Sequence, residues 1–388
     1  MMETETTGLT FGDVAGQTAA KRHLVGLMLA DRLPHALMLA GPSGAGKMAL
    51  ALALSRSLLC QRPTAEGEPC GCCPGCRMTA GWTHPDLHFS FPVIKKKSTD
   101  QPLSDDYLAQ WRGMLADGPY FTQADWLGRL GGEKEQMQHF VGEADSLQQK
   151  LSLRSSQGGR RVVVMWLPER MGEATANKLL KLVEEPPSGT HFLLLSDEPD
   201  RVLGTIQSRT QRLQVPPLGE EDVAQTLVQR YGTEAGEAAR IGHLAQGSMT
   251  RALALMRGQE GTEAEWLELF KQLMRTAYGR QIKEMRAWAD TAAALGRERQ
   301  RSLLQYCQRM VRESFILNFR QPRRLNYLSV DEQVFLSRFA PFVHERNVIG
   351  ITRLLDEAER DIEQNVNARM VMTDVVMRLT VLLLTKGY

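Results

Sequence analysis

Five of the six cysteines fall within a 17-residue stretch of the chain. Four of them, Cys60, Cys70, Cys73 and Cys76, have the spacing C-x9-C-x2-C-x2-C, which supplies four thiolates for a closed tetrahedral zinc site. Cys72 is next to the third of these residues, so we expect it to point elsewhere and not to be a ligand. Such clustering indicates a structural metal site rather than a disulfide framework. A loop of redox-sensitive free thiols is the alternative.

A glycine-rich segment matches the phosphate-binding loop in spacing. Gly41, Gly44 and Gly46 would let backbone N–H groups turn inward onto a phosphate, and Lys47 would reach the outer phosphates. Met48 follows, where a Ser or Thr hydroxyl normally holds Mg²⁺, and a thioether is a poor ligand for that hard cation.

The acidic half of such a site is also absent from its expected place. The apolar run Val162–Leu167 ends in Trp166 and Leu167, where an Asp would hold Mg²⁺. Glu169 comes only after Pro168, too late along the chain. These two losses predict a loop kept as a scaffold without ATP hydrolysis. Whether Lys47 still binds ATP is left open, so ATP is a doubtful cofactor.

The elements that must position these residues alternate between strand-like and helical patterns. Alternation of this kind predicts right-handed crossovers and a parallel α/β sheet. The predicted strands are Ala36–Ala40, Leu87–Phe91, Val162–Leu167, His191–Leu195 and Leu213–Val215. The helices between them include one from the phosphate loop to about Leu59 and one at 174–185.

Three units are expected along the chain. Residues 1–216 form the α/β domain, with the cysteine module at 60–76 and an insertion at about 95–157. Residues 217–260 form a small helical unit, and 261–388 form a bundle of long helices at roughly 262–295, 297–319, 330–340, 344–363 and 366–385.

The insertion is predicted to be helical and partly ordered. Its aromatic residues Trp111, Tyr120, Phe121 and Trp126 argue against disorder. The lysine triplet at 95–97 is best interpreted as a solvated loop, with a contact to nucleic acid as the alternative.

Composition excludes several functional classes. The 388 residues are 43% hydrophobic and 24% charged, and Lys plus Arg (47) nearly balance Asp plus Glu (45). A net charge of +2 is too small for a protein held on nucleic acid mainly by its own field, although a local patch is possible. No apolar run approaches the roughly 20 residues of a membrane span, and residues 1–10 lack the apolar core of a signal peptide. We expect a cytoplasmic protein without a membrane partner.

Several motifs occur together in a specific order: Phe11–Gln17, Pro34–Ala36, Gly41–Lys47, Cys60–Cys76, His84–Leu87, Ala176–Lys181, Glu184–Pro187 and Ser208–Arg212. In this order they resemble the AAA+ subunits of the bacterial DNA polymerase III clamp loader. The resemblance covers about residues 9–260 by motif, and 261–388 by helical pattern alone.

This resemblance implies an AAA+ α/β domain with a zinc module, a helical lid and a helical collar for oligomerisation. The family's gamma and tau motor subunits keep an intact ATP site, whereas its delta prime subunits usually do not. With Met48 and Trp166, the chain is similar to delta prime. The implied partners are gamma/tau and delta in a hetero-pentamer, and, through that complex, the sliding clamp and primed DNA. The implied function is to help open and load the clamp.

The resemblance also assigns one site residue that acts on another chain. The family's Ser-Arg-Cys element corresponds to Ser208-Arg209-Thr210, so Arg209 would be an arginine finger on a neighbour's ATP. Thr210 departs from the family's Cys. The alternative for Arg209 is a surface arginine paired with a local carboxylate. The family's nucleotide-sensing arginine is replaced by Thr250, with Arg251 one residue away.

Two other functions remain open. One is a self-sufficient AAA+ ATPase, a gamma/tau-like motor in DNA replication, that uses Glu169 as a displaced acid. The other is a zinc-ribbon nucleic-acid binder, which is weakened because only Arg62 and Arg77 add charge near the cysteines.

Overall fold

The computed structural model describes residues 9–95, 101–132, 135–153, 155, 159–258, 261–319 and 326–385. They form two compact units: Met1–Gly132 with Met137–Leu253, and Glu133–Gln136 with Ala254–Tyr388. Residues 1–8, Lys96, Lys97 and Gln157, which enter the predictions above, lie outside the described residues.

The first unit is built on a five-stranded parallel sheet with the order β2-β3-β4-β1-β5. Its strands are β1 (Ala36–Ala40), β2 (Leu87–Ser90), β3 (Arg161–Trp166), β4 (Thr190–Ser196) and β5 (Gln211–Gln214). All five predicted strands are present: β1 has the predicted bounds, and the ends of the others differ by at most two residues. The strands β1 to β4 are rich in buried apolar residues, because helices cover both faces of the sheet.

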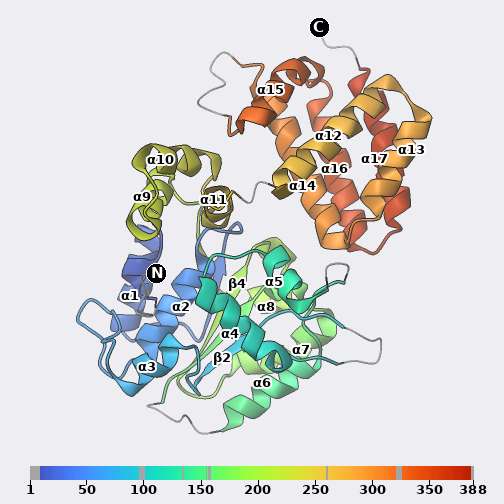
Figure 1. Ribbon diagram of the computed structural model, residues 1–388. Coiled ribbons are helices and arrows are strands. Elements are labelled where there is room, and N and C mark those ends of the chain that lie inside the picture. Colours follow the sequence, from blue (N-terminus) through green and yellow to red (C-terminus); the bar gives the residue numbers. More distant parts are fainter. Residues whose placement is uncertain are drawn as a thin grey trace. The chain divides into compact units, whose positions relative to one another are not determined.

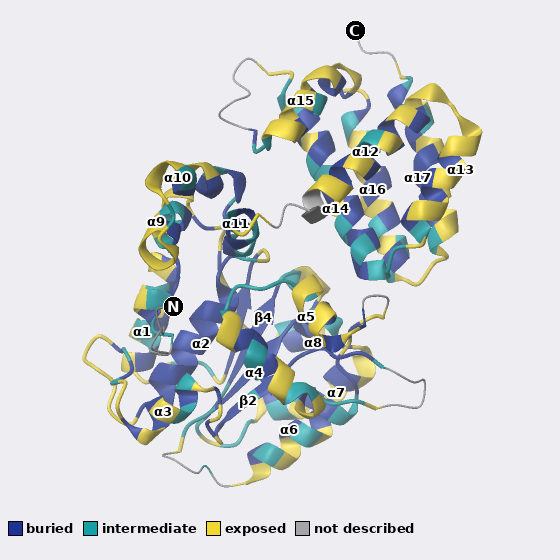
Figure 2. Cartoon of the chain, in the orientation of Figure 1, coloured by how far each residue is buried: buried dark blue, intermediate teal, exposed yellow. Residues whose placement is uncertain are grey.

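Alternate strand residues belong to two separate cores, one on each side of the sheet. Figure 2 shows these strands as largely buried. One core packs β1, β3 and β4 against α1 (Thr18–Leu29), α2 (Lys47–Leu58), α4 (Leu108–Asp117) and α5 (Gln123–Leu130). The other packs the opposite face against α6 (Gly142–Ser152), α7 (Glu173–Glu184) and α8 (Gly204–Gln207). The result is a three-layer α/β/α domain (Figure 1).

The insertion is more closely integrated than its sequence indicated. Trp111 of α4 stacks on Phe91 with ring centroids 4.2 Å apart, and it lies 5.4 Å from Trp166 at the end of β3. Trp111 and Trp126 are fully buried. The described part of the insertion therefore completes the core beside the sheet, because its aromatic side chains cover the apolar edge that β2 and β3 present.

Three short helices follow the sheet: α9 (Glu220–Tyr231), α10 (Ala235–Leu244) and α11 (Met249–Met256). They fall within 217–260, the range predicted for a small helical unit, and they belong mostly to the first compact unit. The N–H of Met249 donates to the carbonyl of Gly44 at 3.0 Å, so α11 begins directly on the glycine-rich loop.

The second unit is helical, with α12 (Gly261–Gly279), α13 (Ile282–Ala293), α14 (Arg297–Ile316), α15 (Val330–Phe339), α16 (Val348–Glu363) and α17 (Ala368–Leu383) around one apolar core. The prediction of a single helix at 262–295 is wrong. Arg280 has φ +53°, a left-handed conformation that ends α12 after Gly279. Among the described helices, none combines the length and apolarity needed to cross a membrane.

Candidate functional site: a filled phosphate loop and a four-thiolate cluster

The glycine-rich loop connects β1, the second strand from one edge of the sheet, to α2. Gly44 and Gly46 have φ of +80° and +95°, which L side chains rarely adopt, and Gly46 is the N-cap of α2. A Cβ at Gly41 would lie 1.9 Å from the carbonyl oxygen of Val215, so the first glycine is required by close packing on the chain after β5. The loop therefore has the strand–turn–helix context of a phosphate-binding loop.

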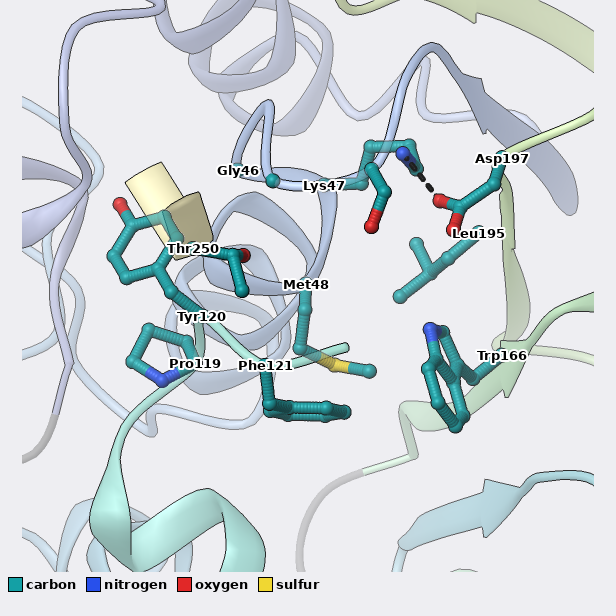
Figure 3. A pocket seen from close by; sticks show the side chains of 12 residues that line it. Gly46, Lys47, Met48, Pro119, Tyr120, Phe121, Trp166, Leu195, Asp197 and Thr250 are labelled. Atoms are coloured by element: carbon teal, nitrogen blue, oxygen red, sulfur yellow. Dashed lines mark ion pairs between the residues drawn. The ribbon is translucent and has the colours of Figure 1, made fainter. Parts of the chain in front are cut away.

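The ammonium group of Lys47 is fully engaged inside its own chain. It donates to the carbonyl oxygens of Gly41 and Pro42 at 2.6 and 2.7 Å, and it forms an ion pair with Asp197 at 2.7 Å (Figure 3). These partners account for the three donors of an ammonium group. Lys47 is only 5% exposed. A phosphate would have to displace the Asp197 carboxylate to reach it.

Side chains fill the space beside the loop. The cavity left there has a volume of about 30 Å³, enough for a water molecule and far too small for a nucleotide. Figure 3 shows Met48 of α2, Trp166 of β3 and the segment Pro119–Phe121 around it. Thr250 of α11, at the place expected for a nucleotide-sensing arginine, also lines the cavity.

Tyr120 anchors this filling segment to the chain before α1. Its hydroxyl oxygen accepts a hydrogen bond from the N–H of Ala15 at 2.9 Å, and burial raises its pKa to about 12. The next ring, Phe121, contacts Trp166 with centroids 5.3 Å apart. The insertion and β3 thus meet over the phosphate loop, where a nucleotide would lie.

Glu169 accepts hydrogen bonds from the backbone after β4. Its Oε1 accepts from the N–H groups of Asp197 and Glu198 at 2.9 and 3.2 Å. Burial, with a smaller effect of the Asp197 charge, raises the pKa of Glu169. Among the described residues it is not part of the cavity lining, so this carboxylate fixes the turn after β4.

The four predicted ligand cysteines come together. The sulfur atoms of Cys60, Cys70, Cys73 and Cys76 all lie within 4.8 Å of one another. The Cys60–Cys73 and Cys70–Cys76 separations are both 3.9 Å, close to the spacing of about 3.8 Å that follows from tetrahedral Zn–S bonds of about 2.3 Å. The donor set therefore fits Zn²⁺.

Backbone N–H groups favour the thiolate of Cys70, whereas burial raises the pKa of Cys60 and of Cys76. N–H groups of Arg62 and Cys70 donate to the sulfur of Cys60 at 3.4 and 3.3 Å. The N–H groups of Cys72 and Cys73 lower the pKa of Cys70 to about 6. Cys72 is exposed and outside the group of four, with its sulfur 3.7 Å from that of Cys70.

Arg209 lies at the opposite end of the sheet from the phosphate loop. It precedes β5, whose first residue Gln211 pairs with Leu37 near the start of β1. The phosphate loop follows the last residue of β1. Arg209 is held by Glu184, whose Oε2 is 2.9 Å from its Nε. The two residues line a surface pocket of about 420 Å³ with Pro34 and His35.

The model of the family described as "DNA polymerase III, delta subunit" matches residues 16–219, more than half of the chain. This match covers the phosphate loop, the cysteine cluster and Arg209. The chain belongs to this family.

Its curated relatives include delta prime subunits of DNA polymerase III. The Escherichia coli subunit is 32% identical over 63% of this chain and 61% of its own length. The Pseudomonas aeruginosa subunit is 33% identical over 53% of this chain and 50% of its own length. A gamma/tau subunit of Mycobacterium tuberculosis is 30% identical over 52% of this chain and 28% of its own length. The chain thus spans about half to three fifths of the delta prime relatives that it matches.

Sequence reasoning missed three residues of these sites. Asp197 follows a strand as the first of three acidic residues, with Glu198 and Asp200, and only the alignment of β4 beside β1 reveals that it pairs with Lys47. Tyr120 is one of the aromatic residues of the insertion, but nothing in the sequence indicates where its side chain packs. Glu184 stands in a recognised motif, but its pairing with Arg209 depends on the packing of α7 on α8.

Proposed function

We propose that this chain is a non-hydrolysing subunit of the DNA polymerase III clamp loader. In this role it assembles with gamma/tau and delta subunits in a hetero-pentamer and helps to open the sliding clamp and load it on primed DNA. It supplies Arg209 to the ATP site of a neighbouring motor subunit, and its four-cysteine module holds a structural zinc. The cytoplasmic location expected from the sequence stays a prediction.

One observation carries the non-hydrolysing role: the phosphate-loop lysine already has a carboxylate partner. Asp197 takes the position at the Lys47 ammonium that a phosphate oxygen would need. Met48 and Trp166 occupy the two places from which Mg²⁺ would be held. The space beside the loop is too small for a nucleotide, Met48 and Trp166 cannot hold Mg²⁺, and Lys47 is already paired. These features favour a structural subunit over one that hydrolyses ATP.

The place of Arg209 supports action on another chain. Leu37 pairs with Gln211 at the start of β5 and comes four residues before Gly41 of the phosphate loop. At about 3.3 Å per strand residue, the start of β5 is therefore roughly 13 Å from the loop along the strand direction. Arg209 therefore lies at the other end of these strands from its own phosphate loop. A guanidinium on that surface can approach the nucleotide of a neighbour and stabilise its transition-state charge.

The rival interpretation, a self-sufficient ATPase, is weakened by the contacts of Glu169. Its carboxylate is used by the backbone after β4 and would have to leave that turn to polarise water. The zinc-ribbon interpretation gains little basic surface near the cysteines, because Arg56, which interacts electrostatically with Cys60 and Cys76, is buried.

The test is the ATPase activity of the assembled clamp-loader complex. We expect Arg209→Ala to leave assembly intact and to lower DNA- and clamp-stimulated turnover, by on the order of 10³ or more at the site that it faces. Arg209→Lys should restore little, because an ammonium lacks the planar fork of a guanidinium. Unchanged turnover and loading with Arg209→Ala would remove the finger role.

A further inference from the structure

Glu184 is the last residue of α7, a place where a carboxylate does not stabilise its own helix. The C-terminus of a helix carries partial negative charge, so an acidic side chain there is unfavourable. Glu184 instead faces Arg209, with Oε2 accepting from Nε at 2.9 Å. The pairing joins two segments 25 residues apart in the sequence.

The backbones on both sides of this pair are fixed. Pro186 and Pro187 follow the helix and prevent its continuation past Glu185. On the other side, the N–H groups of Arg209 and Thr210 close a turn onto the carbonyls of Ile206 and Gln207 at 3.1 and 3.2 Å. Val183 and Ile206, both 1% exposed, belong to one apolar cluster that binds the two elements together.

The guanidinium group of Arg209 is held at two of its three nitrogen atoms, Nε and Nη1. Its Nη1 donates to the carbonyl of Thr205 at 3.1 Å and to Ser208 Oγ at 3.3 Å. Nε is held by Glu184. Within the part of the chain that the structure describes, Nη2 has no hydrogen-bond partner, and Arg209 lines the surface pocket of about 420 Å³.

We propose that Glu184 is a positioning residue for Arg209. Holding Nε and Nη1 fixes the plane of the guanidinium before any partner arrives and leaves Nη2 for an anionic group. A donor oriented in advance contributes more to transition-state stabilisation than one that must first be ordered. This inference rests on the proposed function, since the anionic group would be the neighbour's nucleotide.

The experiment uses the assembled complex in which the phosphate-loop lysines of the motor subunits not facing Arg209 are replaced, so that turnover reports on one site. We expect Glu184→Ala to lower kcat by about ten- to hundredfold with KM for ATP unchanged. Glu184→Gln should recover most of kcat, because its amide oxygen can still accept from Nε. Glu185→Ala is the matched control, removing one exposed carboxylate beside Glu184, and should not change kcat.

A double variant separates this inference from the proposed function. Glu184→Ala combined with Arg209→Ala should be no slower than Arg209→Ala alone, because the carboxylate acts only through the arginine. If Arg209→Ala lowers kcat but Glu184→Ala leaves it unchanged or raises it, the positioning role is wrong and the finger remains. If Arg209→Ala itself has no effect, the finger role fails, and the positioning role fails with it.

Discussion

The ammonium nitrogen of Lys47 lies 2.7 Å from a carboxylate oxygen of Asp197, so the lysine of the glycine-rich loop has its counter-charge within the chain. The two residues meet because β4 lies directly beside β1, with Ser196 level with Ala40. Asp197 is the next residue after β4, at the same edge of the sheet as the phosphate loop. The sheet order thus brings the lysine and its counter-charge together from segments 150 residues apart.

The first prediction concerns ATP turnover by the isolated chain. We expect none above background, and none after Met48→Thr, because Trp166 still stands where the Asp ligand to Mg²⁺ belongs and Tyr120 and Phe121 still fill the cavity. Phosphate release from Mg-ATP, measured beside a Lys47→Ala control, checks both. Turnover by the wild-type chain that disappears in the control would support the self-sufficient ATPase instead.

The second prediction concerns metal content. Protein purified under reducing conditions without chelators should contain one zinc per chain. Cys70→Ser and Cys76→Ser should abolish binding, whereas Cys72→Ser should retain it, because its sulfur lies outside the group of four. Metal analysis of the four proteins distinguishes these cases, and loss of zinc in Cys72→Ser would make Cys72 a ligand.

Zinc removal should loosen the module locally. Cys73 caps α3 (Pro74–Ala80), and Glu68 of the same segment accepts from the N–H groups of Phe11 and Gly12. Since a four-thiolate site contributes folding energy, a chelator should speed amide exchange at 60–80 while the sheet remains protected. Unaltered exchange in metal-free protein would show that the thiols alone hold the loop.

The third prediction is a pH dependence of stability. His139 is buried, with Nε2 3.0 Å from the carbonyl oxygen of Trp166, and burial lowers its pKa to about 4. An unfolded His titrates near 6.5, so the unfolded state takes up a proton first as the pH falls, and stability is lost between about pH 6.5 and 4. From pH 7 to 5 this group alone should cost about 2 kcal/mol.

His139→Gln isolates that contribution. Its amide nitrogen can donate to the Trp166 carbonyl in place of Nε2, but it does not titrate. Urea unfolding at pH 7 and pH 5 should therefore show a smaller loss for the variant, by about 2 kcal/mol. Equal losses in both proteins would mean that other groups, such as His88, whose burial also lowers its pKa to about 4, dominate the acid response.

The features that were predictable from the sequence are local ones. The apolar runs of β1 and β3, the loop glycines and the cysteine spacing each depend on residues close together in the chain, and all appear where predicted. The break at Arg280 was missed because the helical pattern continues through it, although Gly279 marks the turn. The left-handed backbone conformation of Arg280 does not change the spacing of apolar residues from which a helix is predicted.

The features that were not predictable join distant segments. Tyr120 meets Ala15 across 105 residues, and Asp197 meets Lys47 across the sheet. Such contacts depend on strand order and on the path of the insertion, which hydrophobic patterning does not specify. For this reason, the sequence predicts a phosphate loop without metal ligands but carries no signal that side chains of the insertion fill the space beside that loop.

The final prediction tests whether the Lys47–Asp197 pair is structural. Lys47→Met should destabilise the protein by about 3 kcal/mol, because it leaves the Asp197 carboxylate, 13% exposed, beside the buried Glu169. Asp197→Leu alone should cost a similar amount by leaving the ammonium without its counter-charge. The double variant should cost at least 2 kcal/mol less than the sum of the two single costs, since no uncompensated charge remains.

Urea unfolding at pH 7 measures this cycle of variants. The more exposed pair Lys150–Asp105 is the control, and its coupling energy should stay below about 1 kcal/mol. Additive costs at Lys47 and Asp197 would mean that the lysine is not held by this carboxylate.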